Sequence, residues 1–481
     1  MTVHDTDRYF HHLDRKLSYL GESKRHEKIA EDFPKYEHIG SYCDPTVNQQ
    51  RDWVWEIVHG ELHGHSFDPL LAFKMIQPKY STEVLHPDCT CFRRVKAKER
   101  PIKTCSHRDR LLYACWNHYL SRLHKNWLTD NRLQDVVSAY VPRTGKSNAH
   151  YAKHAFDYIR NRASYSAVAI DVKSFFDQIP HDVLEDNLKA LTANGGRLSE
   201  VDFRLFKSAS RYQYIDREEL RATRLRLETA PGMLMTRHRS NWDRLRHHQL
   251  LNKNEGKGIP QGLACSGVLA NIVMMRFDEK LAVLATTNDS IYLRYADDIF
   301  VASPTPQTRQ LIYDRVIEEL NFMNLPLAED KSEWFDFAEA DTVHPTISYL
   351  GLTCQGKEVS VRNNGVNKFY ERTQRFIFSY VLTCRKRGKQ PSLKKIRAIF
   401  GHTAKRNYYA YLRRASEVFE ADPYYKPKGI KGVMRNQLPW LEQQFIQAQS
   451  ARLPKEKHPH RECRLCTCPL QRDRKVTSMT S

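Results

Sequence analysis

The chain has 481 residues, with 76 Lys and Arg against 56 Asp and Glu, so its formal net charge is +20. The hydrophobic share of 41% excludes an integral membrane protein, and the aromatic share of 11% argues against a fully disordered chain. Residues 355–481 hold 28 basic and 9 acidic residues, whereas the preceding residues hold 48 and 47. This asymmetry favours a near-neutral body with a basic appendage that binds a polyanion, above all nucleic acid; a surface kept basic for solubility is the alternative.

The start of the sequence lacks the charged and then apolar stretch of a secretory signal. No apolar run approaches the roughly 20 residues that span a bilayer. The 11 cysteines are scattered and odd in number, as expected of reduced thiols. We therefore expect a cytoplasmic protein without a membrane partner.

Patterns of apolar residues predict the elements in chain order. Residues 1–75 are mostly polar, are expected to be helical, and carry no recognisable chemistry. The strongly basic residues 93–110 predict a hairpin of short strands, and a helix is predicted over 109–128. The apolar, β-branched stretch 166–172 predicts a buried strand, and a helix is predicted over 182–191.

Residues 291–302 alternate around a central Asp-Asp pair, which is the pattern of a hairpin with carboxylates at its tip. Residues 305–324 predict an amphipathic helix. Farther on, apolar spacing and the punctuating prolines predict three helical segments, at about 366–387, 391–419 and 438–452.

Three carboxylates stand in these predicted strands: Asp171, Asp297 and Asp298. An unpaired buried carboxylate is costly, so a buried strand keeps one only for a reason. Two hard cations about 3.5–4 Å apart supply such a reason, because carboxylates bridge them in phosphoryl transfer. Adjacent strand residues face opposite ways, so we expect Asp297 rather than Asp298 to share metal ions with Asp171. An exposed Asp-Asp turn without chemistry is the alternative.

Seven motifs, in the correct order, resemble those of reverse transcriptases. They are Arg100-Pro-Ile with Asp109-Arg110, Ser138 to Ser147, Asp171 to Asp177, Gly258 to Ser266, Tyr295 to Asp298, Leu325 to Ser332, and Tyr349 to Leu352. In that order they are similar to the fingers motif, the Ser-Tyr-Gly-Phe-Arg-Pro-Gly-Arg-Ser stretch, the first aspartate motif, the Pro-Gln-Gly loop, the Tyr-x-Asp-Asp box, the Leu-x-Leu-x-x-x-Lys-Thr motif and the primer grip. Together they make a chance match negligible.

The resemblance implies an α+β fold of the right-hand polymerase type. Its fingers and palm combine an antiparallel sheet with helices, and its thumb is helical and basic. We assign the parts as 1–75 (helical extension), 76–165 (fingers), 166–354 (palm, with an insertion at about 195–255), 355–453 (thumb) and 454–481 (basic tail). The implied activity is that of an RNA-directed DNA polymerase, a nucleotidyltransferase with two Mg²⁺ ions, or Mn²⁺, held by the three aspartates.

Several residues are expected to bind the incoming deoxynucleotide. Arg100 can clamp the triphosphate with its planar fork, and Lys98 can supply a second cation, with a solvated charge run as the alternative for the lysine. The backbone at Gly262 can approach the nucleotide closely, and Gln261 can donate to its sugar or base.

An aromatic side chain at position 176 is implied to select deoxynucleotides. In the enzymes that the sequence resembles, an aromatic residue here blocks a ribose 2′-hydroxyl, so Phe176 is the expected gate. Phe175 is then expected in the core, because neighbouring strand residues face opposite ways. A core role for Phe176 is the alternative.

Other motif residues are assigned to the leaving group, the primer and the template. Lys331 can protonate the leaving pyrophosphate as a general acid, with a surface lysine as the alternative. The stretch Tyr349-Leu350-Gly351 is expected to position the primer. Cations among aromatics in the basic region are expected to follow the phosphates, and they include Lys405, Arg406 and Arg413.

The last part of the sequence holds a group of cysteines. Cys463, Cys466 and Cys468 follow His460 closely, and three thiols with one imidazole suit tetrahedral zinc. Free reduced thiols are the alternative.

No endonuclease or RNase H region is recognisable, which disfavours a group II intron protein and a retroviral polymerase. Retron enzymes are similar in size, but the stretch from Val359 to Val366 departs from their Val-Thr-Gly motif. The resemblance that remains is to bacterial unknown-group and abortive-infection reverse transcriptases. It implies antiphage defence, with an RNA template encoded nearby, dNTPs, a DNA product and often a homo-oligomer. Template-independent or protein-primed DNA synthesis, and an inactive RNA-binding scaffold, are the alternatives.

Overall fold

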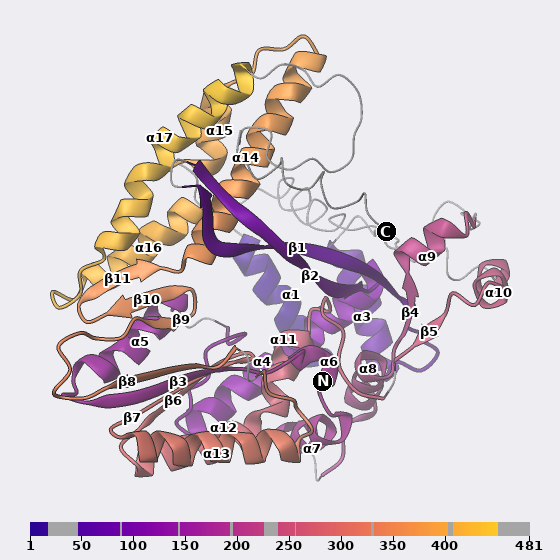
Figure 1. Cartoon of the computed structure of the whole chain (residues 1–481). Helices are drawn as coiled ribbons and strands as arrows, with labels where there is room; N and C mark the ends of the chain where they lie inside the picture. Colours follow the sequence, from indigo (N-terminus) through magenta and orange to yellow (C-terminus); the bar gives the residue numbers. More distant parts are fainter. Residues whose placement is uncertain are drawn as a thin grey trace, which may run out of the picture. The chain divides into compact units, whose positions relative to one another are not determined.

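The computed structural model describes residues 1–17, 47–86, 89–142, 145–192, 196–225, 239–254, 256–328, 331–402 and 407–450. The chain divides into two compact units, whose elements are labelled in Figure 1. The first unit comprises residues 1–75, 100–146 and 157–341, and the second comprises residues 76–99, 147–156 and the described part of 342–481. Helices and largely antiparallel sheets are both abundant, which confirms the predicted α+β class.

The first unit is built on a four-stranded antiparallel sheet in the order β6-β7-β3-β8. Its strands are β3 (Tyr165–Asp171), β6 (Ile291–Tyr295), β7 (Asp298–Ser303) and β8 (Glu333–Phe337). The strands β3 and β7 pair along their length, from Ser166 opposite Ser303 to Asp171 opposite Asp298. The predicted buried strand and the predicted hairpin are therefore confirmed. These segments form strands because their β-branched and aromatic residues suit a buried pleated surface.

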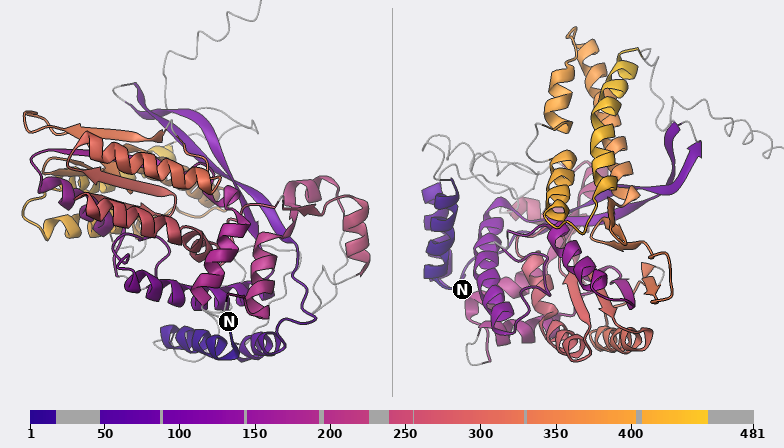
Figure 2. Two further views of the ribbon diagram at one scale, coloured as in Figure 1. Left: turned by 90° about the horizontal axis from the view of Figure 1, so that it is seen from below. Right: turned by 90° about the vertical axis from the view of Figure 1, so that its left-hand side faces the viewer.

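Two helices pack against this sheet, α12 (Met275–Thr287) and α13 (Pro306–Phe322), and lie along one side of it in Figures 1 and 2. The helix α13 is the amphipathic helix that the sequence predicts. Thr305 caps its N-terminus, because its hydroxyl accepts a hydrogen bond from the backbone N–H of Thr308, and Pro306 is the first residue of the helix.

A second sheet, in the order β2-β1-β4-β5, includes strands whose outer parts belong to the second unit. Its strands are β1 (Leu70–His86), β2 (Cys89–Thr104), β4 (Gln213–Asp216) and β5 (Asn252–Lys253). The short hairpin predicted over 93–110 is wrong in extent: those residues provide part of β2, and helix α4 (His107–Asp130) follows at once. The strand ends there because the Ser106 hydroxyl caps the helix by accepting from the N–H of Asp109.

The remaining helices of the first unit surround its core. They are α1 (Val3–Leu17), α3 (Val47–His59), α6 (Phe175–Gln178), α7 (His181–Thr192), α8 (Glu200–Ser210), α9 (Arg217–Ala222), α10 (Arg239–His247) and α11 (Ser266–Val273). None of the described helices is long and apolar enough to cross a membrane.

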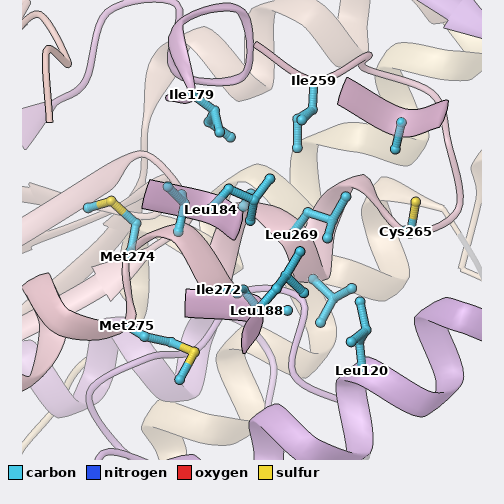
Figure 3. Packing of buried hydrophobic residues seen from close by; sticks show 14 of the residues in the cluster. Leu120, Ile179, Leu184, Leu188, Ile259, Cys265, Leu269, Ile272, Met274 and Met275 are labelled. Atoms are coloured by element: carbon cyan, nitrogen blue, oxygen red, sulfur yellow. The ribbon is translucent and has the colours of Figure 1, made fainter. Parts of the chain in front are cut away.

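The core of the first unit is packed where α4, α7 and α11 meet (Figure 3). Leu120, Leu184 and Leu269 are fully buried there, each contributing about 1.5–3 kcal/mol relative to an exposed side chain. One polar side chain among them, Asn187, donates to the carbonyls of Ile272 and Val273, at 2.9 and 3.1 Å. It satisfies carbonyls at the end of α11 and so fixes the helix that follows the Gly258–Ser266 motif.

The described part of the second unit contains a three-stranded sheet and the helices α14 to α17, together with most of α5. The strands, in the order β11-β10-β9, are β9 (Ile347–Tyr349), β10 (Leu352–Gln355) and β11 (Glu358–Val361). The helices are α14 (Asn363–Lys386), α15 (Leu393–Phe400), α16 (Tyr408–Glu420) and α17 (Lys428–Ser450). Helix α5 (Asn148–Arg160) contributes its first nine residues to this unit.

Two of the three helical segments predicted in this unit need correction. The segment 391–419 is two helices, α15 and α16, of which α15 ends at Phe400 before Gly401. The last segment starts at Lys428 and not at 438. The proline at position 439 does not mark the start of the helix, because α17 continues through it although a proline removes one backbone hydrogen bond. Buried Ile377, Leu441 and Phe445 hold α14 and α17 together, which offsets that loss.

Candidate active site

The three predicted carboxylates lie at one end of the central sheet of the first unit. Asp171 is the last residue of β3 and stands opposite Asp298, the first residue of β7. Asp297 precedes it in the turn, where its carbonyl accepts a hydrogen bond from the N–H of Val172 at 3.2 Å. The turn is tight because Ala296 adopts a left-handed conformation, with φ +57°.

This arrangement changes the argument that favoured Asp297 over Asp298. Strand alternation requires both residues to lie on the strand, but Asp297 lies in the turn and only Asp298 belongs to β7. Residues directly opposite each other on antiparallel strands project from the same face, and Asp298 is the one opposite Asp171. Alternation therefore gives no reason to prefer Asp297, and we retain both residues as candidates.

A fully buried ion pair supports the turn that carries these aspartates. Arg294 donates to both carboxylate oxygens of Asp278, from Nε at 2.6 Å and from Nη2 at 2.5 Å. Its Nη1 also donates to the carbonyl of Ala296 in the turn, at 3.1 Å. The Tyr292 hydroxyl donates to Asp278 as well, at 2.7 Å. Burial alone would lower the pKa of Arg294, but the contact with Asp278 raises it, so the guanidinium stays charged.

The Pro-Gln-Gly loop is fixed by close backbone contacts. The N–H of Lys103 donates to the carbonyl of Gln261 at 3.0 Å, and the Ser266 hydroxyl donates to the carbonyl of Pro260 at 2.6 Å. Gly258 has φ +77°, and a Cβ there would lie 2.6 Å from the carbonyl oxygen of Asp177. Glycine is therefore needed at Gly258 both for its conformation and for its space.

Gly262 offers a sharp test of this loop. Its φ is +145°, and a Cβ would collide with the carbonyl oxygen of Lys103. Gly262→Ala is expected to lower the free energy of unfolding by at least about 2 kcal/mol, measured by urea denaturation. The matched control is Gly64→Ala, which shares the left-handed strain (φ +74°) but meets no atom within 4 Å, so its cost should stay near 1 kcal/mol. Equal losses in the two variants would show that the loop is not tightly packed.

The two phenylalanines after Asp171 lie in a short helix and not on a strand. Ser174 has φ +49°, which turns the chain out of β3 into α6. Phe175 is buried with 2% of its surface exposed, whereas Phe176 is only partly buried. The premise that the pair alternates on a strand is therefore wrong, but Phe175 is the core residue of the two.

Tyr140 packs beside Phe176 and is a site residue that the sequence argument did not single out. Its ring meets that of Phe176 edge to face at 6.4 Å, and the close approach of Gly267 makes room for it. Burial, and next the carboxylate of Asp297, raise the pKa of Tyr140, while Arg100 opposes them. Tyr140 is half-exposed with φ +58°, so a strained backbone presents this ring next to Phe176.

Lys103 is a second residue that sequence reasoning missed. Its ammonium lies over the rings of Tyr212 and Tyr214, at 5.3 and 5.1 Å from their centres. Burial lowers the pKa of Lys103, and Asp177 partly opposes this. The only sequence signal is its position three residues after Arg100, which would not distinguish it from the other lysines of this basic stretch.

Lys331 lies beside the first aspartate and forms an ion pair with Asp171. The preceding segment is joined to the end of β3: the N–H of Lys173 donates to the carbonyl of Pro326, and that of Ala328 donates to the carbonyl of Asp171. Leu325 is fully buried and holds this segment in the core. The structure thus brings two predicted catalytic groups, 160 positions apart, into direct contact.

The predicted primer residues belong to the second unit. Tyr349 is buried at the end of β9, and the turn into β10 contains two left-handed residues, Leu350 and Gly351. Arg413 is an exposed residue of α16, 3.7 Å from Glu417. Some predicted residues, or their side chains, lie outside the described part of the chain: Lys98, Lys405, Arg406, His460, Cys463, Cys466 and Cys468.

Among the described residues, no three His, Cys, Asp or Glu side chains gather closely enough to form a ready-made metal site. The described cysteines Cys105, Cys115, Cys265, Cys354 and Cys384 are free thiols.

The comparison with protein families decides the identity of this fold. The model of the family described as reverse transcriptase (RNA-dependent DNA polymerase) matches residues 87–354, which is more than half of the chain. The chain belongs to the reverse transcriptase family. Members are nucleotidyltransferases of the polymerase fold, and the matched residues of this reverse transcriptase include Asp171, Asp297 and Asp298.

Solved structures of telomerase share a distant likeness with this reverse transcriptase. Apo telomerase from Candida tropicalis is 13% identical with a TM-score of 0.38, over 84% of this chain and 66% of that one. Telomerase from Candida albicans, in complex with a fragment of telomeric RNA, is 12% identical with a TM-score of 0.36, over 83% and 65%. The chain spans about half to two thirds of the telomerase chains that it matches. At these scores the likeness carries no argument, so the family assignment rests on the sequence match.

Proposed function

We propose that this reverse transcriptase is an active RNA-directed DNA polymerase that joins deoxynucleotides by two-metal phosphoryl transfer. The observation that carries the proposal is the meeting of Asp171, at the end of β3, with the aspartate turn of β6 and β7. A solvated surface turn would not need the fully buried Arg294 as its support. The basic excess of residues 355–481 supports a nucleic acid as the polymer bound.

The proposed metal ligands have the chemistry that Mg²⁺ prefers. All three are carboxylates, and Mg²⁺ is usually held by one or two of them together with substrate phosphates and water. When bound, such ions activate the attacking hydroxyl and neutralise the leaving group.

The other residues would bind the nucleotide and hold the proton. Arg100 would clamp the triphosphate, Gln261 would contact the sugar or base, and Phe176 would exclude a ribose 2′-hydroxyl. The Lys331 ammonium would hold the proton that the pyrophosphate takes up, and its pairing with Asp171 keeps it at the site. We expect Tyr349, Leu350 and Gly351 to position the primer.

Phe176→Ala is expected to raise ribonucleotide incorporation relative to deoxynucleotide incorporation by roughly 10- to 200-fold, because the lost ring opens space for a hydroxyl. The measurement is kcat/KM for each nucleotide with the same primer and template. Phe175→Leu is the control, because its buried side chain should affect stability and leave selectivity unchanged. An unchanged ratio in Phe176→Ala would leave Phe176 as a packing residue only.

The biological setting follows from the sequence resemblance alone. We propose a cytoplasmic bacterial enzyme of antiphage defence that copies a small noncoding RNA encoded nearby. We also retain the division into fingers (76–165), palm (166–354) and thumb (355–453) as a proposal.

The experiment that tests the activity is primer extension with the purified chain. With Mg²⁺, dNTPs and an RNA template annealed to a DNA primer, we expect the primer to lengthen, and EDTA to stop it. No extension with any divalent ion would reject the proposed function.

A further inference from the structure

A pocket of about 760 Å³ lies within the first unit, apart from the residues assigned to catalysis. Its described lining residues come from four parts of the chain: 178 and 180–182, 211–213, 253–254 with 256–257, and 323–324. Neither the three aspartates nor Arg100, Phe176 or Gln261 is among its lining residues. Its volume falls in the range of about 300–1,000 Å³ that is typical of small-molecule sites.

Hydrogen bonds between the lining segments hold the pocket open. The N–H of Gly258 donates to the carbonyl of Ile179 at 2.8 Å, and Pro180 forms a β-bridge with Lys257. The Nε2–H of His181 donates to the carbonyl of Gly258 at 2.8 Å, and the Asn254 amide donates to the carbonyl of Ser210 at 2.6 Å. Because backbone groups of separate segments are satisfied in this way, the walls are formed before any ligand arrives.

The charge of the pocket is predominantly positive. Arg211, Lys253 and Lys257 line it together with a single described carboxylate, Asp182. Within the described part of the chain, no ion pair joins any of these three cations to a carboxylate. Burial lowers the pKa of His181, so this ring stays neutral and serves the backbone contact. The three cations are thus available to an anion.

The rest of the lining suits a flat, polar organic group. Tyr212 and Met323 contribute apolar atoms to the lining, with the Lys103 ammonium already over one face of the Tyr212 ring, while Gln178, Gln213 and Asn324 offer amides. Amides that can donate and accept, next to an aromatic or thioether surface, are the usual means of holding a nucleobase. Three cations in the same pocket match a chain of phosphates.

We propose that this pocket is a second ligand site, which binds a nucleoside polyphosphate with its phosphates at Arg211, Lys253 and Lys257. The site is separate from the catalytic residues, and binding there does not depend on polymerase activity. Lys257 directly precedes Gly258, whose left-handed backbone lies against Asp177. An occupant of the pocket therefore restrains the start of the Pro-Gln-Gly loop.

Isothermal titration of the full chain with ATP and with inorganic triphosphate, both in EDTA, tests the proposal. The chelator suppresses metal-dependent binding at the catalytic site. We expect ATP to bind more tightly than inorganic triphosphate, and Lys253→Gln with Lys257→Gln to weaken both by at least about tenfold, through loss of charge-assisted hydrogen bonds. The matched control, Lys125→Gln with Lys207→Gln, removes two exposed charges on α4 and α8 and should change neither affinity.

Three results would overturn the proposal. The first is equal weakening by the control pair, which would reduce the effect to net charge. The second is equal affinity for ATP and inorganic triphosphate, which would remove the nucleoside from the ligand. The third is a pair of results: the wild type does not bind ATP, and the Lys253→Gln with Lys257→Gln variant loses binding to a short single-stranded RNA. That pair would make the pocket a nucleic acid contact. Arg100→Gln should leave ATP binding in EDTA unchanged, so failure of the proposed polymerase function is distinguishable from failure of this site.

Discussion

Replacing Asp297 and Asp298 together by Asn is expected to lower Mg²⁺-dependent nucleotide incorporation by at least about a thousandfold, because the amides cannot hold the cations that stabilise the transferring phosphoryl group. RNA binding should remain largely intact, because the two substitutions leave the basic excess of residues 355–481 unchanged. The measurement is single-turnover incorporation on a primed RNA template, with RNA affinity measured in parallel by filter binding.

Asp186→Asn is the matched control for that double variant. It makes the same chemical change on the exposed face of α7, where Asp186 lies 3.5 Å from Lys189. We expect incorporation by this variant to equal that of the wild type. Incorporation that survives in the double variant would disprove the assignment of the active site.

Asp278→Asn is expected to lower the free energy of unfolding by about 3–5 kcal/mol, because it leaves the fully buried Arg294 cation without its counter-charge. Incorporation should fall as well, because Arg294 also donates to the carbonyl of Ala296, next to Asp297. Urea denaturation and primer extension on the same preparation measure the two effects.

The control for Asp278 is an ion pair with an exposed carboxylate in the same unit. Asp289→Asn removes the partner of Arg162, with atoms 2.7 Å apart, and should leave the denaturation midpoint nearly unchanged. The double variant Asp278→Leu with Arg294→Met should regain much of the lost stability, since neither buried charge remains. Equal shifts for Asp278→Asn and Asp289→Asn would contradict the supporting role of the buried pair.

The sequence was sufficient to predict the central strands and the aspartate turn. The segment 166–172 is short, apolar and β-branched, so few structures other than a buried strand suit it. The Asp-Asp pair between two alternating stretches similarly required a hairpin. Such local patterns determine secondary structure without help from distant residues, and the strands β3, β6 and β7 confirm the predictions made from them.

What supports the site could not be predicted, because it depends on contacts between distant residues. A lysine three residues after Arg100 resembles any exposed cation, yet Lys103 lies over Tyr214 of β4 and over Tyr212, which precedes that strand. Arg294 resembles a polar residue on a half-exposed strand, yet Asp278 compensates its charge inside the core. The backbone turn at Ser174 likewise has no apolar pattern of its own, so Phe175 and Phe176 were placed on a strand that ends before them.

The most direct test of the central claim is the sequence of the DNA that the purified chain makes on a defined RNA. The chain is incubated with Mg²⁺, all four dNTPs and a primed RNA of known sequence, and the products are sequenced. If the chain is an RNA-directed DNA polymerase, the products extend the primer with the complement of the RNA. When the RNA sequence is changed, the sequence of the products changes to the new complement. Products whose sequence is independent of the RNA, or no products at all, would contradict it.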